Sequence, residues 1–417
     1  MDVSSIASVL NVDEDTARFL VGIMLTFPLG YWMSLMPYGL SKHVFASIAG
    51  LYLLRFTLGD QWIHVPIATV VSYAMLWKLP RDLGRYAVPT YAMAYCSYVH
   101  ILRQFYGTFD FSCPQMMLTI KLYSIAWNLY DGHCIHQNRQ LSRASQNCKS
   151  AALIHLPPFL EFSGYCLNFS TVLVGPAYEF VLYKNVCDGV YKKPLTSRWR
   201  PVLVPLLTAA FFAAYHGLLV GKYNVLSNPD LSIIGYIIAF SVFKAKLYFI
   251  WKYVESANNI WFAGFNMDVS SNVDIWDIET APNLSTFTKR WNKKTAEWLN
   301  RYVYQRHDGN AIVVYIIAAV WHGFYPGYYL AYGSAVLWTA CERLGRQRLS
   351  PRFKHSIVYR IAKIASIHVI GAYLHVVFVL RDLDSGLCAW QSQYFAGHLA
   401  MIGFYVCVYY CCREVGK

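Results

Sequence analysis

Residues 311–338 have the sequence AIVVYIIAAVWHGFYPGYYLAYGSAVLW, a run without Asp, Glu, Lys or Arg that contains Pro326 and Gly327 near its middle. A continuous helix over this run would be about 42 Å long, which is long for one crossing of a roughly 30 Å hydrocarbon layer and short for two. Proline breaks or kinks a helix, and broken backbone at membrane depth is tolerated where it is buried or lines a cavity. We therefore predict that this stretch enters a membrane, bends and returns beside a cavity.

The rest of the chain is apolar in the same way. Hydrophobic residues make up 56% of its 417 residues and charged residues 14%, against about 45–50% and about 25% in soluble domains. The sequence predicts an all-α, polytopic integral membrane protein of about 10–11 transmembrane or re-entrant helical segments, in a single domain over 1–417. The other predicted segments are 18–36, 44–58, 62–78, 87–105, 114–130, 159–183, 199–220, 232–253, 357–380 and 395–412.

The loops between these segments carry most of the net charge of +13. Because the basic residues form no stripe on a soluble domain, the charge does not indicate nucleic-acid binding; such loops attract anionic lipid head groups. Lys- and Arg-rich short loops face the cytosol, which predicts a lumenal N-terminus and a cytosolic C-terminus. The run 159–183 has basic flanks on both sides, so we expect a re-entrant hairpin there. The basic loops are 79–86, 137–150, 184–200, 256–310 and 343–354.

Three further features of the sequence limit the alternatives. The eleven cysteines include no Cys-x-x-Cys pair, so we expect buried free thiols and neither a disulfide framework nor a metal site. The acidic first seventeen residues do not resemble a cleavable signal peptide. The sequon at Asn283 lies in a loop predicted to be cytosolic, and we expect it to carry no glycan.

The segment 256–310 is the least apolar long stretch. Trp291, Thr295, Trp298 and Tyr302 recur at the spacing of one helix face, which predicts an amphipathic helix. Two interpretations stay open. The helix lies at the membrane interface with its aromatic side chains toward lipid, or its residues belong to a substrate site. The cations of this segment are Lys293, Lys294, Arg301 and Arg306.

Histidines within apolar segments are costly unless they are partnered or functional. His216, His368 and His375 all lie in such segments, so a histidine of this kind is weak evidence by itself, and we expect those three to be structural. His322 differs because it precedes the Pro326–Gly327 break, where we expect a cavity. It is the candidate for chemistry.

Several of these stretches together resemble the membrane-bound O-acyltransferase family, and most closely its lysophospholipid acyltransferase branch. The joint Trp-Asn and Trp-His-Gly pattern at this spacing is specific to the family, and the similarity spans about 114–340. The stretches are Asn272-Val273-Asp274, Trp291 to Leu299, Tyr302-Val303-Tyr304, Trp321 to Gly327, Pro158 to Phe162, and the residues Lys246, Tyr248, Trp251 and Glu255.

The resemblance implies a fold around a central tunnel, in a multi-pass protein of the endoplasmic reticulum membrane. The family's functional histidine and asparagine are matched by His322 and Asn292. The implied reaction transfers a fatty acyl group from acyl-CoA, a co-substrate, to the free hydroxyl of a lysophospholipid, without a cofactor or metal. Acyl-CoA enters from the cytosol and the lipid acceptor from the bilayer. The candidate substrate-binding residues are Trp291, Lys293, Lys294, Arg301, Trp321, Lys246 and Glu161.

These residue types suit the chemistry. A neutral histidine takes the proton of the acceptor hydroxyl, and the imidazolium then protonates the departing thiolate. The amide of Asn292 is able to stabilise the oxyanion of the thioester carbonyl.

Other classes of function fit less well. None of the thirteen histidines has Asp five positions later, which excludes the soluble-type glycerolipid acyltransferase pattern. A transporter with His322 as a proton relay is disfavoured because the chain has no internal repeat. A neutral-lipid, sterol or protein acyltransferase is the closer alternative.

Overall fold

The computed structural model describes residues 3–107, 112–190, 199–226, 231–262, 270–353 and 355–411. All regular structure in these ranges is helical and none of it is strand, which confirms the all-α prediction. Parts of the predicted basic loops, at 191–198 and 263–269, lie outside the described residues.

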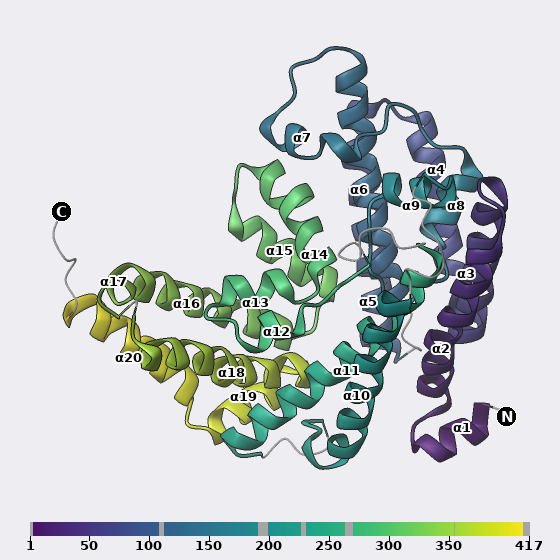
Figure 1. Ribbon diagram of the computed structural model, residues 1–417. Helices are drawn as coiled ribbons and strands as arrows, with labels where there is room; N and C mark the ends of the chain where they lie inside the picture. Colours follow the sequence, from purple (N-terminus) through teal and green to yellow (C-terminus); the bar gives the residue numbers. More distant parts are fainter. Residues whose placement is uncertain are drawn as a thin grey trace. The chain divides into compact units, whose positions relative to one another are not determined.

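The chain shown in Figure 1 forms two compact units. Unit 1 comprises 1–210, 249–272 and 294–322, and unit 2 comprises 211–248, 273–293 and 323–417. The single domain and the central tunnel stay predictions. The helices of unit 1 are α1 (Val3–Leu10), α2 (Glu14–Leu35), α3 (Leu40–Leu58), α4 (His64–Lys78), α5 (Arg81–Tyr106), α6 (Ser112–His136), α7 (Arg143–Asn147), α8 (Phe159–Cys166), α9 (Phe180–Cys187), α14 (Lys293–Trp298, of which Lys293 belongs to unit 2), a π-helical turn (Leu299–Tyr304) and α15 (Ala311–His322).

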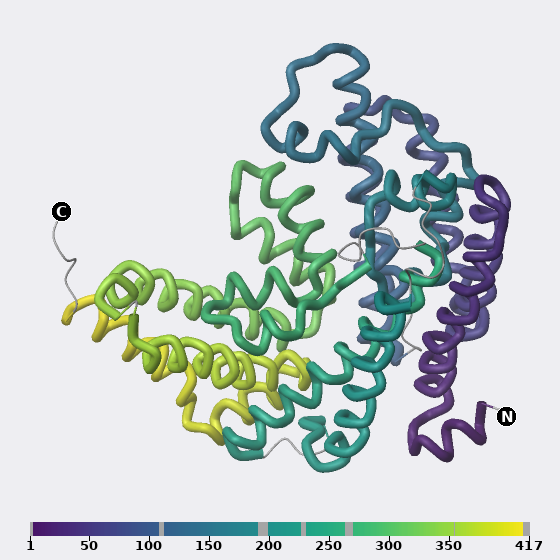
Figure 2. Tube along the Cα trace, viewed as in Figure 1, coloured from purple at the N-terminus to yellow at the C-terminus, as the bar shows by residue number. Residues whose placement is uncertain are grey.

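Two long helices, α10 (Trp199–Tyr223) and α11 (Ile233–Trp261), contribute residues to both units. The other helices of unit 2 are α12 (Ile275–Glu279), α13 (Leu284–Arg290), α16 (Pro326–Arg348), α17 (Ser350–Phe353), α18 (Ile357–Leu380), α19 (Leu383–Ser392) and α20 (Ala396–Cys411). Within this unit, α16 packs against both α18 and α20, and the three run side by side in Figure 2.

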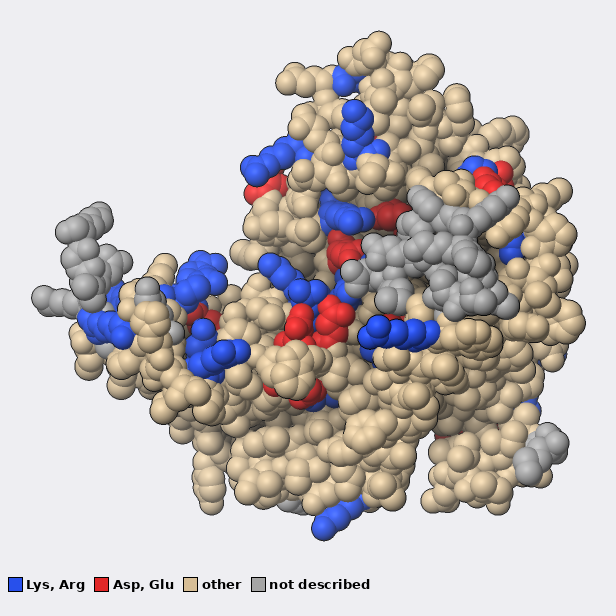
Figure 3. Space-filling model, viewed as in Figure 1, with Lys and Arg blue, Asp and Glu red and all other residues tan. Residues whose placement is uncertain are grey.

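Four helices within the described ranges are long and apolar enough to cross a membrane, namely α2, α10, α11 and α18. A fifth span results if α19 and α20, which are bent by 68° at their junction, are counted as one. Most of the face shown in Figure 3 is uncharged, as expected for surface in contact with lipid. These helices make the chain a multi-pass membrane protein.

The predicted segment 114–130 forms a helix that other parts of the protein surround. Helix α6 packs against α5 and is buried along most of its length. Its Lys121 is 1% exposed, and the ammonium donates to the carbonyl oxygens of Tyr165 at 2.8 Å and Cys166 at 3.2 Å and to the Thr171 hydroxyl at 2.7 Å. The cation thus lies at the carboxyl end of α8, where a helix presents its negative dipole end. The run 159–183 is broken between α8 and α9, as a re-entrant segment requires.

The break predicted within 311–338 is confirmed. Helix α15 ends at His322, Gly323 has a φ of +118°, and α16 begins with Pro326 in its first turn. The residue after Pro326 has to be glycine, because a Cβ on Gly327 would lie 2.1 Å from the carbonyl oxygen of Val377 in α18. The return of this segment to the membrane face it entered stays a prediction.

One expectation is wrong. The aromatic spacing predicts a continuous helix from Trp291, but α13 ends at Arg290 and α14 starts at Lys293, with Asn292 between them at a φ of +47°. The aromatic side chains do not face lipid either, because Trp298 and Tyr302 are 2% and 1% exposed and pack against α6. Periodicity identifies an apolar face but not the partner that covers it.

Candidate functional site

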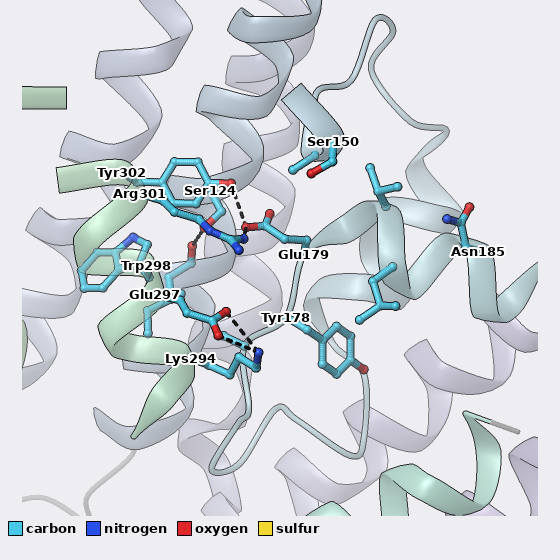
Figure 4. A pocket seen from close by; sticks show the side chains of 15 residues that line it. Ser124, Ser150, Tyr178, Glu179, Asn185, Lys294, Glu297, Trp298, Arg301 and Tyr302 are labelled. Carbon is cyan, nitrogen blue, oxygen red and sulfur yellow. Dashed lines mark hydrogen bonds and ion pairs between the residues drawn. The ribbon is translucent and has the colours of Figure 1, made fainter. Parts of the chain in front are cut away.

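A pocket of about 350 Å³ lies in unit 1. It is bounded by α6, by the chain from Ala177 into α9, by Ser150 and Ala151, and by α14 with the π-helical turn that follows it. Figure 4 shows Glu179 on one side of the pocket, with Arg301 and Tyr302 extending toward it from the other. Two of the predicted substrate-binding residues, Lys294 and Arg301, line this pocket.

The Glu179 carboxylate is the centre of a hydrogen-bond network. One of its oxygens accepts from the Tyr302 hydroxyl at 2.8 Å and from Arg301 at 3.3 Å, and the other accepts from the Asn128 amide at 2.9 Å. The Tyr302 hydroxyl is also 2.7 Å from Asn128 Oδ1. Arg301 and Tyr302 are consecutive residues, and in an α-helix their side chains would point about 100° apart. Here they lie in a π-helical turn, and both donate to the Glu179 carboxylate. Turns of this kind are rare and concentrate at functional sites.

The pocket also holds a second ion pair and an unpaired donor. Lys294 Nζ lies 3.1 Å from the Glu297 carboxylate. Burial by itself lowers the pKa of the Arg301 guanidinium, but the carboxylates of Glu179 and Glu297 outweigh it and raise the pKa above its ordinary value. Trp298 lines the pocket, and its indole Nε1 has no hydrogen-bond partner within the described part of the chain. The pocket therefore offers fixed charges of both signs, while the unpaired indole nitrogen of Trp298 is buried behind its lining.

Arg306 lies outside this pocket lining and is held in the protein interior. Its guanidinium is 2.6 Å from the Asp131 carboxylate, and the two side chains are 3% and 0% exposed. It also donates to the Ser145 hydroxyl at 2.9 Å and lies 4.5 Å from the Trp127 ring centroid. A side chain this buried fits neither a solvated cation nor a cation that contacts substrate. The ion pair of Arg306 with Asp131 instead joins α6 to the helical turn Gln305–His307.

His322 is the last residue of α15, and the residue before it anchors that end of the helix. The carbonyl oxygen of Trp321 accepts from His100 Nε2 at 2.9 Å, and the indole of Trp321 donates to the Met116 carbonyl at 3.1 Å. Trp321 is 2% exposed. This predicted substrate-binding residue therefore acts as an anchor, while the half-buried His322 ring follows it at 4.8 Å between centroids.

Asn292 belongs to unit 2, in the turn between α13 and α14. Trp291 stacks on Phe287 at 5.8 Å and meets the edge of Tyr248 at 5.9 Å. Lys293, another predicted substrate-binding residue, is 8% exposed and lies 3.1 Å from Asp274. Asn292 belongs to unit 2 and His322 to unit 1.

The two remaining candidates differ in their surroundings. Glu161 in α8 forms an ion pair with Lys184 at 2.9 Å, and Lys184 also lies 3.1 Å from Asp188. Lys246 in α11 is exposed, and within the described ranges its ammonium forms no hydrogen bond or ion pair. Its neighbour Lys244 is the buried lysine of this helix.

The lysine at 244 forms a cluster that joins α11 to α12. Its ammonium is 2.7 Å from the Glu279 carboxylate, which also accepts from the Tyr248 hydroxyl at 2.7 Å. His368 Nε2 lies 3.0 Å from the Glu279 carbonyl oxygen, in line with its expected structural role.

Sequence analysis missed Glu179, Asn128 and Asp274. Glu179 contacts Tyr302 across 123 positions of the chain, and no local pattern reveals such a pairing. Asp274 did carry a signal, since it belongs to a stretch that resembles the family signature, but that resemblance assigned it no role. Polar residues inside apolar runs, such as Asn128 in α6, are the general signal that could have directed attention to the network.

Comparison with known proteins gives consistent results. The model of the membrane-bound O-acyltransferase family matches residues 94–380. The chain is 28% identical to the Gallus gallus membrane-bound glycerophospholipid O-acyltransferase 2, over 87% of this chain and 78% of the relative. It is 27% identical to the Homo sapiens membrane-bound glycerophospholipid O-acyltransferase 1, over 94% and 89%, and 27% identical to the Arabidopsis thaliana lysophospholipid acyltransferase 1, over 98% and 97%.

Proposed function

Because the chain belongs to the membrane-bound O-acyltransferase family, we propose that it transfers a fatty acyl group from acyl-CoA to the free hydroxyl of a lysophospholipid. Membership of this family makes the protein an enzyme and not a transporter. The names of the relatives favour a glycerophospholipid product over a neutral-lipid, sterol or protein product.

The observation that carries the proposal is the position of His322. It ends an apolar helix at a break in the chain, and the buried Trp321 beside it fixes that end through His100 and Met116. A base whose backbone is held by buried contacts keeps its ring in place while a substrate binds. His216, which we expect to be structural, lies instead within α10, away from any break in the chain, and its Nδ1 is 3.1 Å from the Val242 carbonyl oxygen.

The proposed reaction is a direct transfer. His322 takes the proton of the acceptor hydroxyl as that oxygen attacks the thioester carbonyl, and Asn292 donates a hydrogen bond to the resulting oxyanion. The C–S bond then breaks, and the imidazolium returns its proton to the CoA thiolate. The acyl ester and free CoA are the products, and neither a covalent acyl-enzyme nor a cofactor is required.

The pocket of unit 1 is the proposed entry site of acyl-CoA. Ser150, Asn185 and Arg301 line it and come from loops predicted to be cytosolic. Arg301 and Lys294, which line the pocket, are able to meet phosphate groups. With these loops in the cytosol of an endoplasmic reticulum membrane, the proposed topology has its N-terminus in the lumen and its C-terminus in the cytosol.

The test is transfer by the purified protein. Wild-type protein in lipid nanodiscs is incubated with a panel of lysophospholipids and acyl-CoAs, and the products are identified by mass spectrometry. His322→Ala should abolish transfer and remain folded, while the matched His216→Ala should retain it. No transfer to any lysophospholipid, or equal activity of the two variants, would refute the proposal or its base.

A further inference from the structure

The backbone at Asn292 has an unusual conformation. Its φ of +47° lies in the left-handed region, between the end of α13 at Arg290 and the start of α14 at Lys293. Asn tolerates this region better than most residues, but one such residue between two helices persists only where its surroundings fix it. Contacts that hold the turn must therefore exist on both sides of Asn292.

Asp274 makes contacts on both sides of the turn, and a second carboxylate, that of Asp277, lies 3.1 Å from Arg290 alone. Asp274 Oδ2 lies 2.9 Å from the Arg290 guanidinium and 3.1 Å from the Lys293 ammonium, and the Asp274 backbone N–H donates to the Arg290 carbonyl at 3.2 Å. The two cations flank the turn, one on its α13 side and one on its α14 side. Asp274 thus bridges the two ends of the segment that carries Asn292.

The surroundings strengthen this bridge. The Lys293 and Asp274 side chains are 10% and 27% exposed, so water screens their attraction less than that of a surface pair. Trp291, between the two bridged residues, is held by Phe287 on one face and Tyr248 on its edge. The residues on either side of Asn292 are therefore fixed by side-chain contacts.

We infer that Asp274 is a positioning residue, which bridges Arg290 and Lys293 and so sets the place of the Asn292 amide in the reaction. The inference rests on the proposed function, in which Asn292 stabilises the oxyanion. It also gives Lys293 a role beyond the substrate contact expected from the sequence, because its ammonium pairs with Asp274. Loss of the bridge should then reduce turnover rather than affinity for acyl-CoA.

The experiment compares Asp274→Asn, Asn292→Gly and the double variant in the full-length protein. The control is Asp82→Asn, which removes a carboxylate from a surface pair with Arg139 at 3.4 Å, 52% and 48% exposed. Turnover and the Michaelis constant for acyl-CoA are measured. Displacing a catalytic group by about 1 Å costs up to about 100-fold, so Asp274→Asn should lower turnover by about 10- to 100-fold, with the Michaelis constant changed less than about twofold. Asp82→Asn should match wild type.

The double variant tests whether Asp274 acts through Asn292. If it does, adding Asp274→Asn to Asn292→Gly causes no further loss, because residues that act as a unit are not additive. Multiplied losses, unchanged turnover in Asp274→Asn, or an effect on the Michaelis constant alone would each overturn the inference. Full turnover in Asn292→Gly would overturn it too, since no group would then need positioning.

A second readout does not depend on activity. Amide hydrogen exchange of the peptide around Trp291 should be faster in Asp274→Asn than in wild type and unchanged in Asp82→Asn; equal exchange in all three overturns the bridge. This result stands even if wild type acylates no lysophospholipid, an outcome that refutes the proposed function alone. If Asp274→Asn does not fold, Lys293→Gln replaces it. The same loss of turnover is then expected, with rescue by Lys293→Arg, and a rise in the Michaelis constant alone overturns the inference.

Discussion

Replacement of Asn292 by glycine separates the side chain's contribution to catalysis from the backbone conformation. At a φ of +47°, glycine adopts the left-handed region without steric cost, whereas alanine there costs about 1–2 kcal/mol. Loss of one oxyanion donor costs about 10²–10³ in turnover, or about 2.7–4 kcal/mol of transition-state stabilisation. Asn292→Gly should therefore lower turnover by that factor with little loss of stability, and Asn292→Ala should show the same loss in a less stable protein.

The assay is the rate of acyl transfer at saturating acyl-CoA, together with the unfolding midpoint of each purified variant. Asn292→Asp is the matched variant, because it keeps the size and the backbone tolerance of Asn but has no N–H to donate; its turnover should fall at least as far. Recovery of the wild-type rate by Asn292→Gly in excess acyl-CoA would show that Asn292 binds substrate and does not act in the transition state. Normal turnover in Asn292→Asp would refute the donor role.

Arg306→Ala should destabilise the protein by about 3–5 kcal/mol, because it leaves the Asp131 carboxylate buried without its partner, and denaturant unfolding measures the difference. Arg301, whose side chain is 40% exposed, should behave differently: Arg301→Ala should raise the Michaelis constant for acyl-CoA, more at low salt, as steady-state kinetics at two salt concentrations will show. Gly327→Ala should destabilise by about 1–3 kcal/mol, since its Cβ would overlap the chain of α18, and a lowered unfolding midpoint checks this. Asn283 caps α13 through its side chain and lies in a predicted cytosolic loop, so an intact-mass measurement on protein from a eukaryotic host should find no glycan.

The apolar runs predicted most of the helices, because lipid and protein interiors both select long apolar segments. Helix α18 has the bounds expected for 357–380, and the break before Pro326 follows from proline geometry. Periodicity failed at Asn292, where one left-handed residue interrupts an otherwise regular aromatic spacing. A pattern over many residues does not resolve a single φ angle.

The site was predicted less completely for a different reason. Sequence identifies charged residues but not their partners, so Arg306 was grouped with the other cations of segment 256–310, whereas Asp131 holds it in the interior. The family resemblance made Trp321 a candidate for substrate contact, and it could not show that the indole and the carbonyl of this residue anchor α15. Pairings such as that of Glu179 with Tyr302 depend on the three-dimensional fold.

The polarity of α6 has a consequence for how the protein is made. This helix is not among the described helices apolar enough to cross a membrane by their composition, and it carries Lys121 and Asp131 at buried positions. A nascent chain that had reached only α6 would hold these groups without the carbonyls of α8 or the guanidinium of Arg306. The buried charges of α6 therefore obtain their partners only after α8 and the segment that carries Arg306 have been synthesised.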